Sequence, residues 1–250
     1  MLDQAELERA AREYGTDKAG DYLANYVREF AHLADEPLSL LELGVREGAS
    51  LLLWRDMFPR AQIAGLDINP MSLSDDSGRV HAYQGLQQDR AILDRIASEV
   101  APEGFDVIVD DASHLGRLTA ASFGHLFPNH LKPGGIYVIE DWGTGYWPNF
   151  PDGKAYGGPY PAPGQRSKPP TVEPAAPRGI EGLMARLRRS AVRDRFPSHD
   201  YGMVGFIKTL VDAVSVDLGG PLPAGERRVS GSEIASVKIM AAQVFVQKAL

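Results

Sequence analysis

The chain contains no cysteine, and this absence excludes disulfide bonds and metal sites with thiolate ligands. It also has no apolar stretch that approaches the ~20 residues of a membrane-spanning helix. Its first residues, MLDQAELERAAREYG, are charged and helical in pattern, unlike the basic and then apolar segments of a signal peptide. We therefore expect a cytoplasmic protein that has no membrane partner.

Positive charge is in the minority. The chain has 33 acidic and 26 basic residues, for a net charge of -7, which argues against a nucleic acid or an anionic membrane as its main partner. Hydrophobic residues make up 44% and charged residues 24% of its 250 residues, as in an ordinary globular protein. A chain of this length can bury a full core within one large domain.

Short apolar runs alternate with helical patterns along much of the chain. Strands are expected at LSLLEL (38–43), AQIAGLDI (61–68), RVHAYQG (79–85), FDVIVD (105–110), GIYVIE (135–140), ASVKIM (235–240) and AQVFVQK (242–248). Helices are expected at 49–58, 89–100, 115–126 and 202–214. Continuous apolar strands that alternate with helices indicate a parallel sheet covered on both faces. We therefore predict an α/β fold, doubly wound and Rossmann-like, with a mostly parallel seven-stranded sheet and a C-terminal antiparallel hairpin.

Two regions fall outside this alternation. Residues 1–35 are expected to form an N-terminal helical extension, with two helices around the loop YGTDKAG (14–20), before a domain at 36–250. Within that domain, residues from about 143 to 197 hold 10 of the 18 prolines, together with several aromatic residues. So much proline in a long loop predicts either a lid insertion over an active site or a disordered segment.

The segment ELGVREG (42–48) connects the first expected strand to a helix. Glycines in such a turn let the backbone approach a ligand closely, and the following helix N-terminus favours negative charge. The spacing of Gly44 and Gly48 is not the G-x-G-x-x-G of a dinucleotide site, which counts against NAD. The second strand ends in Asp67, where an acid accepts hydrogen bonds from a ribose in this class of fold. The pattern predicts a nucleoside-containing ligand.

Two of the expected strands end in pairs of carboxylates. One ends in Asp110 and Asp111, and the other in Glu140 and Asp141. If these strands are neighbours, ~4.8 Å apart, their like charges raise the pKa of at least one carboxyl group unless a cation neutralises them. Oxygen ligands favour Mg²⁺ over Zn²⁺, so we predict a magnesium site. The same carboxylates could instead cap the following helices or face solvent.

Six segments carry a resemblance to a known family. They are YGTDK (14–18), ELGVREGASLLLWRDMFPRAQIAGLDI (42–68), YQGLQQD (83–89), FDVIVDDASH (105–114), LKPGGIYVIEDW (131–142) and SHDYGMVGFIKTLVD (198–212). In this order they resemble the class I S-adenosylmethionine-dependent methyltransferases, and most closely the macrocin and mycinamicin group of macrolide sugar O-methyltransferases. The resemblance implies an O-methyltransferase of antibiotic biosynthesis that uses S-adenosylmethionine and Mg²⁺. Its acceptor would be a small molecule, such as a glycosylated polyketide, and we expect a homo-oligomer.

The resemblance also assigns roles to particular residues. The turn after the first strand would hold the methionine part of the cofactor, the acid after the second strand the ribose, and the YQGLQQD segment would lie near the adenine. The expected cofactor-binding residues are Thr16, Lys18, Glu42, Gly44, Gly48, Asp67, Gln87, Asp89 and Asp110. The D-x-x-H and E-D pairs of the family imply that Asp111, Glu140 and Asp141 bind the metal.

His114 follows Asp111 by three residues, and we predict that it is the catalytic base. An aliphatic hydroxyl has a pKa of ~15.7 and an unperturbed histidine ~6.5, so complete proton transfer between them would cost ~12 kcal/mol. A metal that stabilises the developing charge makes histidine sufficient as the proton acceptor. Alternatively, His114 bonds a carbonyl at the helix start. His199 is a lesser candidate base, and the remaining histidines are predicted to be surface or packing residues: His32, His81, His125 and His130.

Two other functions are compatible with the same pattern. A catechol-type O-methyltransferase would use the metal to bind two phenolic oxygens. A non-catalytic protein could keep the fold and bind S-adenosylmethionine without turnover. The intact D-x-x-H and E-D pairs disfavour the second alternative, because a protein that has lost catalysis should lose them first.

Overall fold

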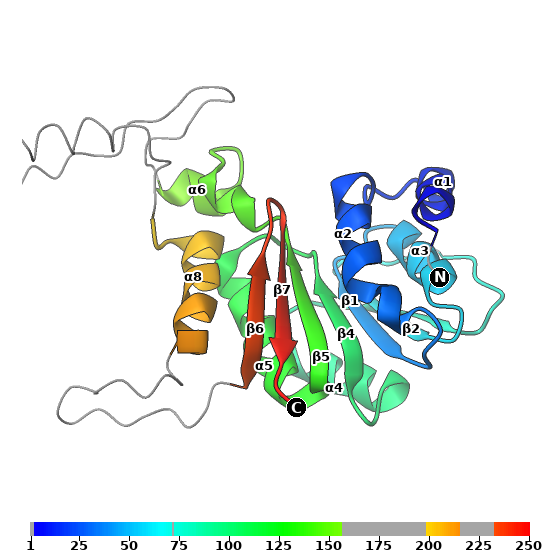
Figure 1. The fold of residues 1–250 in the computed structure, drawn as a ribbon. Helices are drawn as coiled ribbons and strands as arrows, with labels where there is room; N and C mark the ends of the chain where they lie inside the picture. The colour runs from blue at the N-terminus through cyan, green and yellow to red at the C-terminus, as the bar shows by residue number, and fades with distance from the viewer. Residues whose placement is uncertain (1–2, 72, 157–198, 216–232) are drawn as a thin grey trace, which may run out of the picture.

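A computed structural model describes residues 3–71, 73–156, 199–215 and 233–250. In these residues a seven-stranded sheet has the order β3-β2-β1-β4-β5-β7-β6 (Figure 1). The strands are β1 (Ser39–Leu43), β2 (Gln62–Asp67), β3 (Val80–Gln84), β4 (Phe105–Asp110), β5 (Leu131–Glu140), β6 (Ile234–Ile239) and β7 (Gln243–Lys248). The first five strands are parallel to one another, whereas β7 is antiparallel to both β5 and β6. The predicted fold class, including the C-terminal hairpin, is confirmed.

Helices cover both faces of this sheet (Figure 1). They are α1 (Gln4–Tyr14), α2 (Asp21–Phe30), α3 (Ala49–Met57), α4 (Arg90–Val100), α5 (Gly116–His130), α6 (Pro151–Tyr156) and α8 (Gly202–Ser215), with short 3₁₀ helices η1 (Ala31–Leu33) and η2 (Trp142–Tyr146). Apolar residues of α1, α2 and α3 pack on one face, and those of α4, α5 and α8 on the other. No helix in the described ranges is long and apolar enough to span a membrane.

The central strands have both faces buried, which explains their continuous apolar sequences. Val107, Ile108 and Val109 of β4 are all inaccessible to solvent although successive side chains point to opposite faces. Ile108 belongs to the core beside α4 and α5, and Val107 and Val109 to the core beside α2 and α3. The carboxyl end of β4 is therefore held between two packed layers.

The N-terminal helices are part of one of these cores. On α2, Tyr26 and Phe30 are fully buried, and the Tyr26 ring lies edge-on to Trp54 of α3, with 4.8 Å between ring centroids. The rings of Tyr26 and Phe30 also lie near Phe245 of β7. Truncation of a buried aromatic residue costs ~3–5 kcal/mol, so this cluster fixes α2 and the loop before it against the sheet.

The described part of the predicted lid consists of η2 and α6, and the rest lies outside the described residues. Asp152 of α6 is buried, and its Oδ2 accepts hydrogen bonds of 2.8 Å from the backbone N–H groups of Gly116 and Met203. These donors belong to the first turns of α5 and α8, whose N–H groups have no partner within the helix. One carboxylate therefore joins three helices close to the carboxyl edge.

Candidate active site

The carboxyl ends of β1, β2 and β4 bring most of the predicted cofactor residues together. A cavity of about 170 Å³ is lined by Gly44, Asp67 and Gln87, among others. A second cavity, of about 150 Å³, is lined by Thr16 and Lys18 and shares Gly44 with the first. An elongated ligand can therefore contact both cavities across Gly44.

Gly44 is required by the packing of two turns. Its φ is +81°, in the region that favours glycine, and a Cβ here would lie 2.3 Å from the carbonyl oxygen of Asp111 and 2.4 Å from Cα of Ala112. Both contacts are with backbone atoms, which cannot move aside as a flexible side chain would. The turn after β1 therefore lies directly against the turn after β4, at the junction of the two cavities. Gly48 also has a positive φ, +93°.

Asp67 is fixed at the end of β2. It is 7% exposed, its Oδ2 accepts a 2.8 Å hydrogen bond from Arg46 N, and its Oδ1 accepts one of 2.8 Å from Asn69 N. A carboxylate has about four lone-pair sites, so these two bonds leave acceptors for a ligand. The carboxylate that lines the first cavity is thus held in place without being saturated.

Asp110 does not line the first cavity but accepts a hydrogen bond from Gln87, which does. Its carboxylate is buried and accepts hydrogen bonds from Gln87 Nε2 at 3.1 Å, Ser122 Oγ at 2.6 Å and Tyr137 OH at 2.9 Å. The oxygen of the Gln87 amide accepts from Ser113 N at 3.1 Å. Burial raises the pKa of Asp110 to about 6, while the bonds from Ser122, Tyr137 and Gln87 oppose the rise. Asp110 therefore positions Gln87.

Four of the predicted cofactor residues line neither cavity: Glu42, Gly48, Asp110 and Asp89. Asp89 is the one of these that caps a helix. Its side chain is exposed, accepts a 3.0 Å hydrogen bond from Ala91 N and caps α4. It does not line the first cavity, where Leu86, Gln87 and Gln88 of the same segment do. Asp89 has the sequence context of an adenine contact, but its position is that of a helix cap.

Lys18 supplies a cation that reasoning from the strand ends missed. Its buried Nζ lies 2.8 Å from Asp111 Oδ2, 2.9 Å from Glu140 Oε2 and 3.1 Å from Glu42 Oε1. Burial would lower the pKa of Lys18, but the three carboxylates, led by Glu140, raise it well above its usual value. Lys18 was predicted as a cofactor contact from the YGTDK motif. Its contact with the carboxylates at the strand ends was not predicted, because Lys18 lies far from them along the chain.

Burial and neighbouring carboxylates both raise carboxyl pKa values at this edge. Burial, and then the charge of Glu140, raise the pKa of Asp111 well above its ordinary value, and Lys18 only partly opposes this. Burial also raises the pKa of Glu42, against Lys18 and a hydrogen bond from Ser50. These are the shifts expected where carboxylates outnumber the cations that face them.

Glu42 and Glu140 are internal partners of Lys18. Glu42 is fully buried and accepts hydrogen bonds from Ser50 Oγ at 2.5 Å and Trp54 Nε1 at 2.9 Å. Glu140 is 2% exposed; its Oε2 accepts from Lys18 and its Oε1 from the Tyr26 hydroxyl. In this arrangement both oxygens of Glu140 are engaged, and its role as a metal ligand stays a prediction.

Asp111, His114 and Asp141 face a common point. His114 Nε2 lies 4.0 Å from Asp111 Oδ1 and 3.8 Å from Asp141 Oδ2, too far for hydrogen bonds. The other oxygen of Asp111 accepts from Lys18, and the other oxygen of Asp141 accepts from the Tyr22 hydroxyl. Each of the three side chains therefore has one ligand atom that faces the other two, and these three atoms lie within 4.8 Å of one another. The spacing suits a small cation between them.

Two of these three residues have a strained backbone. His114 has φ +52° and Asp141 φ +54°, in the left-handed region that non-glycine residues seldom adopt. The predicted helix at 115–126 begins at Gly116 and extends to His130, because its last turns bury apolar residues, so His114 precedes the helix. Burial lowers the pKa of His114, and the charge of Asp141 opposes this. The lowered pKa favours the neutral imidazole, which is the form that accepts a proton.

His199 lies in other surroundings. Its ring packs edge-on to Tyr146, with 4.7 Å between centroids, and its Nδ1 accepts a 3.2 Å hydrogen bond from Tyr201 N. Burial lowers the pKa of His199, and the charge of Lys208 lowers it further. The residue lines neither cavity and is not in the group around His114.

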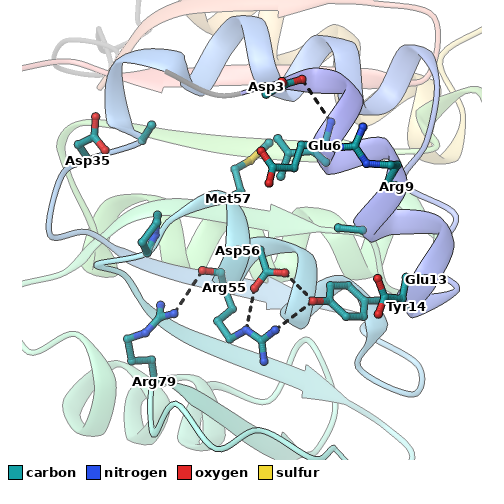
Figure 2. Close-up of a pocket in the computed structure, with 14 residues that line it drawn as sticks. Asp3, Glu6, Arg9, Glu13, Tyr14, Asp35, Arg55, Asp56, Met57 and Arg79 are labelled. Carbon is teal, nitrogen blue, oxygen red and sulfur yellow. Dashed lines mark hydrogen bonds and ion pairs between the residues drawn. The ribbon is translucent and has the colours of Figure 1, made fainter.

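A larger cavity, of about 640 Å³, lies between α1 and α3 (Figure 2). Its central groups bond one another: Tyr14 donates to Asp56 at 2.5 Å, Arg55 donates to Tyr14 at 3.1 Å, and Arg79 donates to the Arg55 carbonyl at 3.3 Å. None of the predicted site residues lines it. These bonds attach α1 to α3, and the candidate site remains at the carboxyl edge.

Comparison with known proteins shows what the chain resembles. No protein-family model matches it. It is 41% identical over 155 residues to the mycinamicin VI 2''-O-methyltransferase of Micromonospora griseorubida, and 36% identical over 155 residues to the demethylmacrocin O-methyltransferase of Streptomyces fradiae. Each match covers 58% of this chain and 38% of the relative. The chain is related to the sugar O-methyltransferases of antibiotic biosynthesis. The predicted resemblance is confirmed.

A solved structure agrees with this relationship over nearly the whole chain. The MycE methyltransferase of the mycinamycin biosynthetic pathway, in complex with Mg and SAH, superposes with a TM-score of 0.69 at 30% sequence identity. The match covers 97% of this chain and 54% of MycE. This chain thus has the class I methyltransferase fold, but spans about half the length of MycE and about two fifths of the curated relatives.

Proposed function

We propose that this protein is an S-adenosylmethionine- and Mg²⁺-dependent O-methyltransferase that methylates a sugar hydroxyl of a glycosylated natural product. The observation that carries the proposal is the group formed by Asp111, His114 and Asp141 beside two cavities that meet at Gly44. The names of the related enzymes support the reaction, and the Mg and SAH in MycE support the cofactors.

The two cavities fit the two parts of S-adenosylmethionine. The nucleoside would occupy the cavity lined by Asp67 and Gln87, where the free lone pairs of Asp67 accept hydrogen bonds from ribose hydroxyls. The amino-acid part would occupy the cavity lined by Thr16 and Lys18. Gly44, at the junction, leaves room for the centre of the ligand because it has no side chain.

The charges at the carboxyl edge fit a divalent cation. Glu42, Asp111 and Glu140 share the ammonium group of Lys18, and Asp141 lies beside His114. Four carboxylates therefore face one ammonium group and a neutral imidazole, and the site stays negative even with one carboxyl protonated. Asp111 and Asp141 would hold the metal through the oxygens that face His114. A bound divalent cation lowers the pKa of a hydroxyl and stabilises negative charge on its oxygen. Lys18 and Tyr22 keep the two carboxylates oriented.

His114 would receive the proton of the acceptor hydroxyl. Its lowered pKa favours the neutral imidazole, and its Nε2 already faces Asp111 and Asp141. The positive charge that develops on the imidazole would be stabilised by Asp141, 3.8 Å away. General-base catalysis of this kind contributes ~10²–10⁴-fold to a rate. Cytoplasmic location and a homo-oligomeric state remain predictions.

The proposal is tested by mass spectrometry. The enzyme is incubated with Mg²⁺, S-adenosylmethionine carrying a labelled methyl group, and a panel of glycosylated polyketides, their aglycones and a simple catechol. We expect one labelled methyl group on glycosides and none on aglycones. Methylation of the catechol alone would favour the catechol-type reaction. Binding of S-adenosylmethionine without methylation of any acceptor would favour a non-catalytic protein.

A further inference from the structure

A second group of metal-ligating side chains lies between α4 and α5. His125 Nε2 and His130 Nε2 of α5 each lie 2.7 Å from the same oxygen, Oδ1 of Asp94 on α4. His125 is buried, the His130 side chain is 20% exposed, and the Asp94 side chain is 55% exposed. The three ligand atoms lie within 4.8 Å of one another. None of these residues belongs to the candidate active site.

The spacing of the two histidines conceals this group in the sequence. In a regular α-helix, residues five apart point ~140° away from each other. His130 is the last residue of α5, and Pro128 in its final turn has no backbone N–H to donate to the preceding turn. In the structure the two imidazole centroids are only 5.2 Å apart. The end of the helix thus turns His130 toward Asp94 and His125.

The group also has an open side. A cavity of about 440 Å³ reaches Asp94 and His130 and is lined by residues just before β4 and β5, including Gly104 and Asn129. These residues lie at the amino ends of the strands, the opposite edge of the sheet from Asp111 and Asp141. The cavity provides an entry path for an ion and room for a water molecule as a further ligand.

We propose that Asp94, His125 and His130 form a second metal site, which binds Zn²⁺ or a borderline divalent ion of the same class. Two imidazole nitrogens and one carboxylate oxygen are a ligand set of zinc, whereas Mg²⁺ prefers oxygen ligands. Tetrahedral zinc with ligands at ~2.0–2.1 Å needs them ~3.3 Å apart, so the 2.7 Å contacts must widen by about half an ångström. The ion would link α4 to α5.

Metal binding changes the proton positions of both imidazoles. Without an ion, each Nε2 carries the hydrogen that it donates to Asp94, and the two imidazoles lower the pKa of that carboxyl group. A metal ligand needs the Nε2 lone pair, so the hydrogen of each ring moves to Nδ1. The tautomer change distinguishes a metal site from a simple pair of hydrogen bonds between the helices, because it occurs only when a metal binds.

The test measures zinc binding by competition with a chromophoric chelator. An Asp141→Asn background removes one ligand atom from the candidate active site. We expect this variant to bind one equivalent of Zn²⁺, with a rise in melting temperature and with the ¹⁵N shifts of two histidines moving to the Nδ1–H tautomer. Asp94→Asn keeps a hydrogen-bond acceptor for both rings but weakens the ligand; added to this background, it should lower zinc affinity by more than about tenfold.

Two further variants make the result decisive. His130→Gln in the same background should also lower zinc affinity by more than about tenfold. His81→Gln is the matched control, because His81 Nε2 lies 2.9 Å from the side-chain oxygen of Gln62 and His81 is in neither metal-ligating group of the described residues; its zinc affinity should equal that of the background. The proposal is overturned if the Asp141→Asn protein binds no Zn²⁺, or if Asp94→Asn and His130→Gln bind it as tightly as the background does.

Discussion

Lys18→Met should lower the free energy of unfolding by about 3–5 kcal/mol, the usual cost of removing one partner of a buried ion pair. The ammonium group lies 2.8–3.1 Å from Asp111, Glu140 and Glu42, and all four groups are largely buried. Methionine has a similar volume, so the packing of the aliphatic stem is retained. The loss would therefore come from the charges rather than from a cavity.

The same variant should become more sensitive to alkaline pH. A carboxyl group with a folded-state pKa above its unfolded value stabilises the fold below the unfolded pKa and loses that contribution as pH rises through the folded pKa. Burial already raises the pKa of Asp111 and Glu42, and removal of Lys18 raises both further. The difference in unfolding free energy between parent and Lys18→Met should thus be larger at pH 8 than at pH 5.5.

Urea unfolding followed by circular dichroism at these two pH values measures the effect. Lys132→Met is the matched control: Lys132 Nζ lies 2.8 Å from Asp106 Oδ2, but both side chains are partly exposed, so its loss should cost only ~0–1 kcal/mol. A Lys18→Met protein that loses less than ~1 kcal/mol, by the same amount at both pH values, would refute the reasoning.

Three further variants test separate parts of the site. Asp67→Ala should weaken S-adenosylmethionine binding by ~1.5–3 kcal/mol, the value of hydrogen bonds to a charged group, and unchanged affinity in calorimetry would exclude Asp67 as the ribose ligand. His114→Ala should lower kcat by ~10²–10⁴-fold with little change in cofactor or Mg²⁺ affinity. Loss of metal binding would show that His114 is a ligand, and a normal kcat would show that His114 is structural. In the parent, the free energy of unfolding should fall by ~3 kcal/mol as pH rises from 4 to above 6, because buried Asp110 ionises in this range. Asp110→Asn should not show this fall, and denaturant unfolding across the same pH range measures the difference.

The elements of the fold could be predicted from the sequence because their signals are local. The run from Phe105 to Asp110 is continuous and apolar, as expected of a central parallel strand buried on both faces, and β4 has these bounds. The pairing of β6 with β7 likewise follows from the short connection between them. The end of α5 was missed, since Pro128 indicates a helix break, while burial of Phe127 and Leu126 extends the helix beyond the predicted end.

The sequence predicted that carboxylates converge at the site, but not the contact of Lys18 with them or the backbone conformation of His114 and Asp141. Neighbouring parallel strands end at the same edge of a sheet, so Asp111 and Asp141 could be placed together once β4 and β5 were taken as neighbours, as the family resemblance implies. Lys18 lies 93 residues from Asp111 in the sequence, and no periodic pattern links a loop lysine to a distant strand end. The left-handed backbone of His114 and Asp141 depends on tertiary packing, because neither residue favours that conformation by itself.

The requirement of methyl transfer for Mg²⁺ tests the central claim most directly. Enzyme stripped with EDTA and then desalted should have no activity on a glycosylated acceptor, and Mg²⁺ alone should restore it in the parent and in Asp94→Asn, but not in Asp141→Asn. Restoration by Mg²⁺ in Asp94→Asn separates this requirement from any zinc bound between α4 and α5. Full activity of the parent in excess EDTA would contradict the account, because Asp111 and Asp141 would then not hold a metal that the reaction needs.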